Sequence, residues 1–139
     1  MMPSLNNYHI LISHSWDYNN DYTTIKGWLD AAPYFYWSDY SVPLDNPLDV
    51  NSKRELQHKL DNRIAMCSCI IVLSGMYVSY SEWIDFEIRT ALKYDKPIIA
   101  VKPWGQQRIP SIISTYADEI VGWNSDSVIN AVRAHGLIG

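Results

Sequence analysis

The sequence predicts an α/β fold in which five strands alternate with helices, as a single domain over residues 1–139. Two observations lead to this prediction. Short apolar runs rich in β-branched residues recur along the chain, and segments with apolar residues at helical spacing lie between them. Because such alternation is typical of a parallel sheet with helices on both faces, we expect a flavodoxin-like three-layer sandwich with strand order 2-1-3-4-5.

The first strand and the first helix have clear boundaries. Residues 8–13 form a short apolar run that ends abruptly in a polar loop, as a buried strand does. Helix-starting side chains follow at 19–21, and apolar residues then repeat at helical spacing up to Pro33, which predicts a helix over 21–31. Residues 34–42 are aromatic and alternate only loosely, which favours an edge strand followed by a proline-containing loop.

Two sequences of capping-box form, S-x-x-E, precede the next two helices. The one at residues 52–55 predicts a helix that runs to about Met66, and the one at residues 79–82 predicts a helix over about 81–94. A continuous apolar strand over 67–73 lies between them. The remaining predicted elements are a strand over 97–101, a polar turn over 102–108, a short helix over 112–116, a strand over 119–123 and a last helix capped by Ser125 or Asp126.

The composition argues against several classes of partner. The net charge is −4 and the Lys and Arg residues are scattered, so no nucleic acid is expected to bind. Residues 1–7 hold neither a basic nor an apolar run, and no apolar segment reaches the roughly 18–20 residues of a membrane span. We therefore expect a cytoplasmic protein that does not bind membranes.

Cysteine and histidine usage gives no indication of a metal site. Cys67 and Cys69 alternate along one predicted strand, and the chain has no further cysteines to pair with them. We interpret both as buried free thiols, without a disulfide framework or a zinc site. The four histidines lack metal-ligand spacing, so neither a metal nor a cofactor is predicted.

The predicted helix over 81–94 carries an indole and a carboxylate four positions apart, Trp83 and Glu87. We expect both on the flank of the core face, with Glu87 at the border between packed side chains and a cleft. The ordinary alternative is that Glu87 forms an ion pair on a solvated helix face. The core face itself is predicted from apolar residues at i, i+4, i+7 and i+8: Ile84, Ile88, Ala91 and Leu92.

A ligand of an open parallel sheet binds beyond the carboxyl ends of the strands, where the strand order reverses. Here that point lies between the first and third strands. The loops that reach it are rich in hydroxyl groups and aromatic rings, and the loops after the second and fourth strands form its walls. The residues expected to contact a ligand are Ser13, His14, Ser15, Asp17, Tyr40, Ser74 and Lys102.

Several known chemistries lack their required residues. The chain has no G-x-G-x-x-G after the first strand and no P-loop sequence, and Ser74 stands where a phosphoacceptor receiver domain needs an aspartate. His14 could act as an acid or base, or only as a hydrogen-bonding loop residue. Asp17, Asp21 and Asp39 could hold Mg²⁺ in a nuclease, or serve as caps and turns.

Four short motifs occur in order along nearly the whole chain: residues 12–15 (ISHS) with Asp17, residues 40–43 (YSVP), residues 81–83 (SEW) with Glu87, and residues 101–105 (VKPWG). Together they resemble the TIR-like domain of bacterial ThsB proteins from Thoeris antiphage defence. The resemblance implies a TIR fold that takes NAD⁺ as substrate and cleaves its nicotinamide–ribose bond. The product would be an ADP-ribose-derived signal, cyclic or conjugated, that activates a separate effector protein.

The resemblance also implies residue roles. Glu87 matches the catalytic glutamate, which would stabilise an oxocarbenium-like ribose. Trp83 would pack beside the ribose or the nicotinamide, and Ser13, His14 and Ser15 would supply polar contacts.

The chain departs from many TIR enzymes in two places. Ile84 stands where a cysteine follows the tryptophan, and the second loop reads YSVPLD at residues 40–45. TIR domains self-associate through this loop, so the chain is a candidate homo-oligomer whose assembly mode cannot be carried over. Two alternatives remain open: a non-catalytic TIR adaptor, and a nucleotide-binding or nuclease module.

Overall fold

The computed structural model describes residues 7–44, 50–105 and 108–136. Its centre is a sheet of five parallel strands in the order β3-β1-β5-β6-β7. Counted along the chain without the two short strands β2 and β4, this order is 2-1-3-4-5, so the predicted topology is confirmed. The bounds of these strands are Asn7–Ile12 for β1, Tyr36–Asp39 for β3, Cys69–Leu73 for β5, Ile98–Val101 for β6 and Glu119–Val121 for β7.

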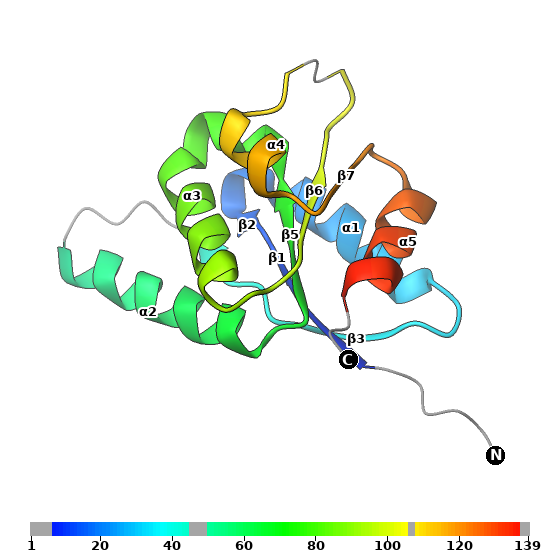
Figure 1. Cartoon of the computed structure of the whole chain (residues 1–139), viewed down its shortest axis with the longest axis horizontal. Coiled ribbons are helices and arrows are strands. Elements are labelled where there is room, and N and C mark those ends of the chain that lie inside the picture. The colour runs from blue at the N-terminus through cyan, green and yellow to red at the C-terminus, as the bar shows by residue number, and fades with distance from the viewer. Residues whose placement is uncertain (1–6, 45–49, 106–107, 137–139) are drawn as a thin grey trace.

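Helices cover both faces of the sheet (Figure 1), which makes the three layers expected for a flavodoxin-like fold. On one face α1 (Asn19–Ala31) packs beside α5 (Ser125–His135). On the other face α3 (Tyr77–Lys93) lies between α2 (Val50–Met66) and the short α4 (Ser111–Tyr116). The central strand β5 is buried along its whole length, because helices cover it on both sides.

The loops at the carboxyl edge of the sheet are more ordered than the sequence predicts. After β1 the chain forms a short strand β2 (His14–Ser15), which pairs in parallel with β4 (Pro43–Leu44). A 3₁₀ turn over Trp16–Tyr18 precedes α1, and another over Ser74–Met76 leads into α3. Two-residue strands have no periodicity that a sequence pattern could reveal, so β2 and β4 were not predicted.

Three predicted helix starts are wrong. Helix α2 begins at Val50, so Ser52 lies inside its first turn, and α3 begins at Tyr77, because the 3₁₀ turn before it leads directly into the helix. The backbone of α3 does leave helical geometry at Tyr80 (φ −130°, ψ 33°), next to the predicted start at Ser81. Helix α5 is capped by Asn124, whose side chain accepts a hydrogen bond from the Ser127 N–H at 3.0 Å.

The core face predicted for α3 is correct except at its last position. Ile84, Ile88 and Ala91 are fully buried against the sheet, whereas 44% of Leu92 is exposed. Leu92 lies in the last turn of α3, close to where the chain leaves the helix for β6.

Cys67 and Cys69 are buried and free, and only Cys69 lies on β5. The Cys67 thiol donates to the Ile64 carbonyl at 3.2 Å. Burial raises the pKa of Cys67 to about 12, and it raises the pKa of Cys69 as well, so both remain protonated thiols at neutral pH.

Replacement of Cys69 by Ala should therefore affect stability and leave activity unchanged. We expect a loss of about 1–2 kcal/mol in unfolding free energy, because the sulfur atom is removed from a closely packed strand. Chemical denaturation measures this loss, and a thiol reagent should label the native protein far more slowly than the unfolded chain. Lost turnover in a variant with normal stability would contradict this structural role.

Candidate active site

Glu87 and Ser13 form the centre of the candidate site. Glu87 projects from α3 and is fully buried, and its Oε1 accepts a hydrogen bond from the Ser13 hydroxyl at 2.9 Å. Ser13 directly follows β1, and its own N–H donates to the Ile71 carbonyl of β5 at 2.9 Å. The two side chains therefore meet at the carboxyl edge of the sheet between β1 and β5, where the strand order reverses.

The expectation that Glu87 borders an open cleft is wrong, since its exposed fraction is 0%. Trp83, one turn earlier in α3, is also buried and packs edge-on against Phe86. The contact that the structure shows at the carboxylate itself comes from the loop after β1, because the Ser13 hydroxyl donates to Glu87 Oε1. An ordinary surface ion pair is excluded for Glu87 by the same burial.

Burial governs the protonation of Glu87. Loss of hydration raises its pKa to about 8, and the hydrogen bond from Ser13 lowers the pKa and only partly opposes this effect. Its second oxygen, Oε2, is buried and has no hydrogen-bond partner among the described residues. A neutral carboxyl group with an unpaired oxygen destabilises a folded core, and such groups are concentrated at functional sites.

His14 is held in place by its neighbours. Its ring stacks on Tyr22 with centroids 3.8 Å apart, and its Nε2 lies 3.0 Å from Asn19 Oδ1. The Tyr22 hydroxyl in turn donates to Asp39. His14 is therefore a buried, oriented side chain, and the alternative that it is a hydrogen-bonding residue of the surface is wrong about its exposure.

Asp17 and Tyr80 connect the first loop to the beginning of α3. The Tyr80 hydroxyl donates to Asp17 Oδ2 at 2.6 Å, and this bond raises the pKa of Tyr80. Tyr80 is buried and carries the kink in α3, and Ser15 is buried as well. Of the predicted site residues, Ser13 and Asp17 thus connect the first loop to α3, whereas the His14 ring packs against α1.

Three predicted site residues lie elsewhere. Tyr40 stacks on His9 and lies under the guanidinium group of Arg63, on the β3 side of the sheet. Ser74 is buried and donates to the Val101 carbonyl at 3.2 Å, which ties the end of β5 to the end of β6. Lys102 directly follows β6 and lines a separate pocket.

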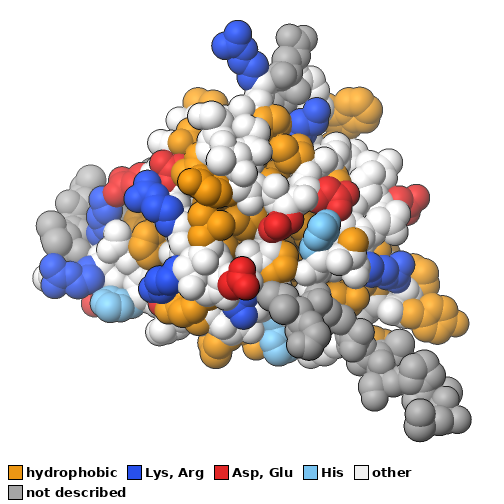
Figure 2. Space-filling model, in the orientation of Figure 1, with side chains coloured by type: hydrophobic (Ala, Val, Ile, Leu, Met, Phe, Trp, Pro, Cys, Tyr) orange, Lys and Arg blue, Asp and Glu red, His pale blue; other side chains and the backbone are white. Residues whose placement is uncertain are grey.

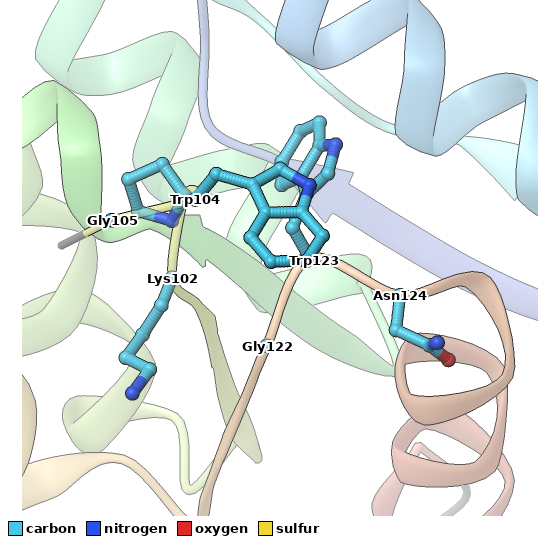
Figure 3. Close-up of a pocket in the computed structure, with 7 residues that line it drawn as sticks. Lys102, Trp104, Gly105, Gly122, Trp123 and Asn124 are labelled. Carbon is cyan, nitrogen blue, oxygen red and sulfur yellow. The ribbon is translucent and has the colours of Figure 1, made fainter.

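This pocket lies where β6 and β7 end and has a volume of about 340 Å³ (Figure 3). A second pocket of about 330 Å³ adjoins it, because both are lined by Pro103, Trp104 and Trp123. Trp123 was not predicted as a site residue. The signal that could have revealed it is an aromatic residue two positions after the end of a short strand. The first pocket is also lined by Lys102, Gly105, Gly122 and Asn124.

Asp17, Asp21 and Asp39, which could hold Mg²⁺ in a nuclease, do not form a metal-binding cluster in the described part of the chain. Asp17 accepts from Tyr80, Asp39 accepts from Tyr22, and Asp21 lines the second pocket. Within residues 7–44, 50–105 and 108–136, no three His, Cys, Asp or Glu side chains come together in a way that could hold a metal ion. No helix in these same ranges is long and apolar enough to cross a membrane.

The sequence model of the Thoeris protein ThsB, TIR-like domain, matches residues 11–108. The chain belongs to this family. The matched segment begins within β1 and ends after Trp104, so it contains both Ser13 and Glu87 together with Lys102. A comparison with curated proteins gave no match.

Two solved structures have a fold similar to that of this ThsB-type TIR-like domain. The Clostridium botulinum CMP N-glycosidase BcmB has a TM-score of 0.58 and 14% identity, over 90% of this chain and 98% of that one. A 3-dehydroquinate dehydratase-like protein from Bifidobacterium longum has a TM-score of 0.54 and 13% identity, over 93% of this chain and 95% of that one. At these identities the likeness concerns the fold alone.

Proposed function

We propose that this ThsB-type domain cleaves the bond between nicotinamide and ribose in NAD⁺, with Glu87 as the catalytic carboxylate. The observation that carries the proposal is the buried Glu87 side chain, bound to Ser13 at the ligand-binding edge of the sheet. The product is an ADP-ribose-derived signal that activates a separate effector protein. Family membership supports this reading, and a CMP N-glycosidase on the same fold is consistent with cleavage of a nucleotide's N-glycosidic bond.

The reaction needs a negative charge and no strong acid. When the bond between the anomeric carbon and the nicotinamide nitrogen breaks, its electron pair stays on nitrogen and neutralises the pyridinium ring. Positive charge then develops on the ribose, where ionised Glu87 stabilises the oxocarbenium-like transition state. The Ser13 hydroxyl orients the carboxylate by donating to Oε1.

Substrate binding favours the ionised form of Glu87. In the free protein its pKa of about 8 leaves most of the population neutral at pH 7. A cationic nicotinamide ring beside the carboxyl group lowers the pKa again, because the opposite charge stabilises the carboxylate. NAD⁺ reaches the fully buried Glu87 only after the covering loops move, which fits a domain that rests in a closed state until it is triggered.

Replacing Ser13 with Ala tests the role of this hydroxyl. The variant loses the bond that favours ionised Glu87, so the pKa of Glu87 rises further and the carboxylate is scarcer at pH 7.5. We expect kcat/KM for NAD⁺ to fall about tenfold or more, with the pH–rate profile displaced to higher pH. Ser38→Ala, on the edge strand β3, is the matched control. An unchanged pH profile in Ser13→Ala would show that the hydroxyl does not act on Glu87.

The identity of the product depends on which nucleophile reaches the anomeric carbon. Water gives ADP-ribose, a group of the same nucleotide gives a cyclic form, and another small molecule gives a conjugate. The buried rings of Trp83 and Tyr80 lie on α3 four and seven positions before Glu87, and aromatic groups beside a reacting centre exclude water. We therefore expect a signalling nucleotide in modest amounts, without depletion of cellular NAD⁺.

The test uses the full chain purified from phage-infected cells, incubated with NAD⁺. Mass spectrometry identifies the products, and the protein-free mixture is applied to a candidate effector. We expect nicotinamide together with an ADP-ribose-derived species that activates the effector. Free ADP-ribose as the sole nucleotide product, with no effector response, would indicate a plain NAD⁺ hydrolase. Intact NAD⁺ would favour the adaptor, and degraded nucleic acid in a parallel reaction would favour the nuclease.

A further inference from the structure

The pocket between the ends of β6 and β7 has an unusual lining for a protein surface. Trp104 is 86% exposed, yet it stands beside a second indole, Trp123, in the walls of two adjoining pockets. Trp123 is partly buried and packs edge-on against Trp28 of α1, with ring centroids 5.1 Å apart. One indole is thus packed against α1 and the other is exposed to solvent, an arrangement suited to stacking on a flat ligand.

Polar groups surround these rings on both sides. Lys102 is the cation of the first pocket, and in Figure 3 its side chain extends along one side of the Gly122 backbone, with Asn124 on the other. Asn20, Asp21 and Thr24 of α1 line the second pocket. A flat ring system flanked by an anionic group on one side and hydroxyl groups on the other matches this set, and a nucleotide has this composition.

The position of the pocket along the sheet edge relates it to Glu87. In the order β1-β5-β6-β7, Ser13 follows β1, Lys102 follows β6 and Trp123 follows β7. Three strand spacings, about 14 Å, separate β1 from β7. The two regions are also joined by packing, because Pro103 lies against Gly75 so closely that an added Cβ would be 3.1 Å from its Cγ.

We propose that this pocket, named here the tryptophan pocket and formed by Trp104, Trp123 and Lys102, binds the adenosine diphosphate part of the substrate. The adenine ring stacks on Trp104 and Trp123, and the diphosphate pairs with Lys102. The order nicotinamide ribose, diphosphate and adenine then follows the order Glu87, Lys102 and Trp123 along the sheet edge. This inference rests on the proposed function for its substrate, and it is tested separately by binding.

ADP is the probe, because it lacks the nicotinamide ribose and cannot be cleaved at Glu87. In the ¹⁵N-labelled full chain, the indole N–H signals of the tryptophans are followed during ADP titration. We expect the signals of Trp104 and Trp123 to shift and that of Trp37 to stay, since Trp37 donates to Asp30 and lines neither pocket. ADP that leaves the Trp104 and Trp123 signals unchanged would overturn the proposal.

Two variants with matched controls assign the contacts. Trp104→Ala is expected to weaken ADP binding at least about fivefold, whereas Tyr116→Ala, which removes an exposed ring from α4, leaves it unchanged. Lys102→Gln should weaken the binding of ADP more than the binding of adenosine. Lys59→Gln, on the exposed side of α2, should weaken the binding of neither ligand. Because Trp104 is mostly exposed, its removal leaves the core intact. Wild-type ADP affinity in Trp104→Ala would contradict the stacking.

Kinetics separate this proposal from the proposed function. Nicotinamide mononucleotide carries the scissile bond without adenosine, so Trp104→Ala should raise KM for NAD⁺ and leave nicotinamide release from the mononucleotide unchanged. If ADP binds in the tryptophan pocket while NAD⁺ stays intact, the assignment of the pocket as a nucleotide-binding site is supported and the proposed NAD⁺ cleavage is contradicted. If NAD⁺ is cleaved equally well by wild type and Trp104→Ala, the proposed function stands and the pocket assignment is wrong.

Discussion

Glu87→Gln is expected to reduce nicotinamide release from NAD⁺ at least about a thousandfold and to leave the protein folded. The amide keeps the shape of the side chain and an oxygen that accepts from Ser13, but it cannot carry the negative charge that stabilises the ribose cation. The same change removes an acid that is unfavourably buried. Loss of turnover should therefore accompany a gain in stability, as is common where active-site residues are strained or desolvated.

Turnover and melting temperature have to be measured on the same preparations to establish this result. Glu55→Gln is the matched control, because it makes the same chemical change on the exposed side of α2. We expect the control to match wild type in both measurements. Wild-type turnover in Glu87→Gln would show that the site is assigned to the wrong carboxylate, and an unfolded variant would show that Glu87 is structural.

The second large effect is a fall in stability of the wild-type protein with rising pH. The pKa of Glu87 is raised from 4.5 to about 8 in the folded chain. Between these two values the unfolded state releases its proton while the folded state keeps it, so the contribution of Glu87 to stability is fully present below pH 4.5 and is lost as pH rises through 8. The loss amounts to a few kcal/mol, or on the order of 10 °C in Tm.

A comparison with Glu87→Gln isolates this contribution, because every other titratable group is the same in the two proteins. The variant's Tm minus the wild-type Tm should grow from pH 5 to about pH 8 and then level off. Thermal melts by circular dichroism at intervals of half a pH unit would show this. A difference that stays constant across this range would mean that Glu87 is not an uncharged buried acid.

The order of strands and helices could be predicted because the sequence patterns that indicate them extend over many residues. Alternating apolar strands and amphipathic helices fixed the topology, and the core positions Ile84, Ile88 and Ala91 followed from helical spacing. Helix starts were less predictable, since Ser52 and Ser79 have capping-box form but lie inside α2 and α3.

The sequence predicted that Glu87, Trp83 and Ser13 belong to the site, but it did not predict that Glu87 is buried. Spacing brought Trp83 beside Glu87, and the topology brought Ser13 to the same edge of the sheet. Glu87 is fully buried and contacts Ser13 in the loop after β1, and the loops at this edge contain two-residue strands and 3₁₀ turns. Such short elements have no periodic pattern, and so a side chain at the flank of a helix could not be distinguished from one beneath a closed loop. Tyr40 was misplaced for a similar reason, because its cation–π contact with Arg63 depends on how α2 packs.

The most direct test of the account is the pH dependence of nicotinamide release from NAD⁺, measured for wild type and Glu87→Gln purified from phage-infected cells. At low substrate concentration the rate reports kcat/KM and thus the ionisation of the free protein. With ionised Glu87 as the active form, wild-type release should rise between pH 6 and 9 with a midpoint near 8, and Glu87→Gln should stay at background throughout. Release that falls with rising pH, or release by Glu87→Gln at the wild-type rate, would contradict catalysis by Glu87.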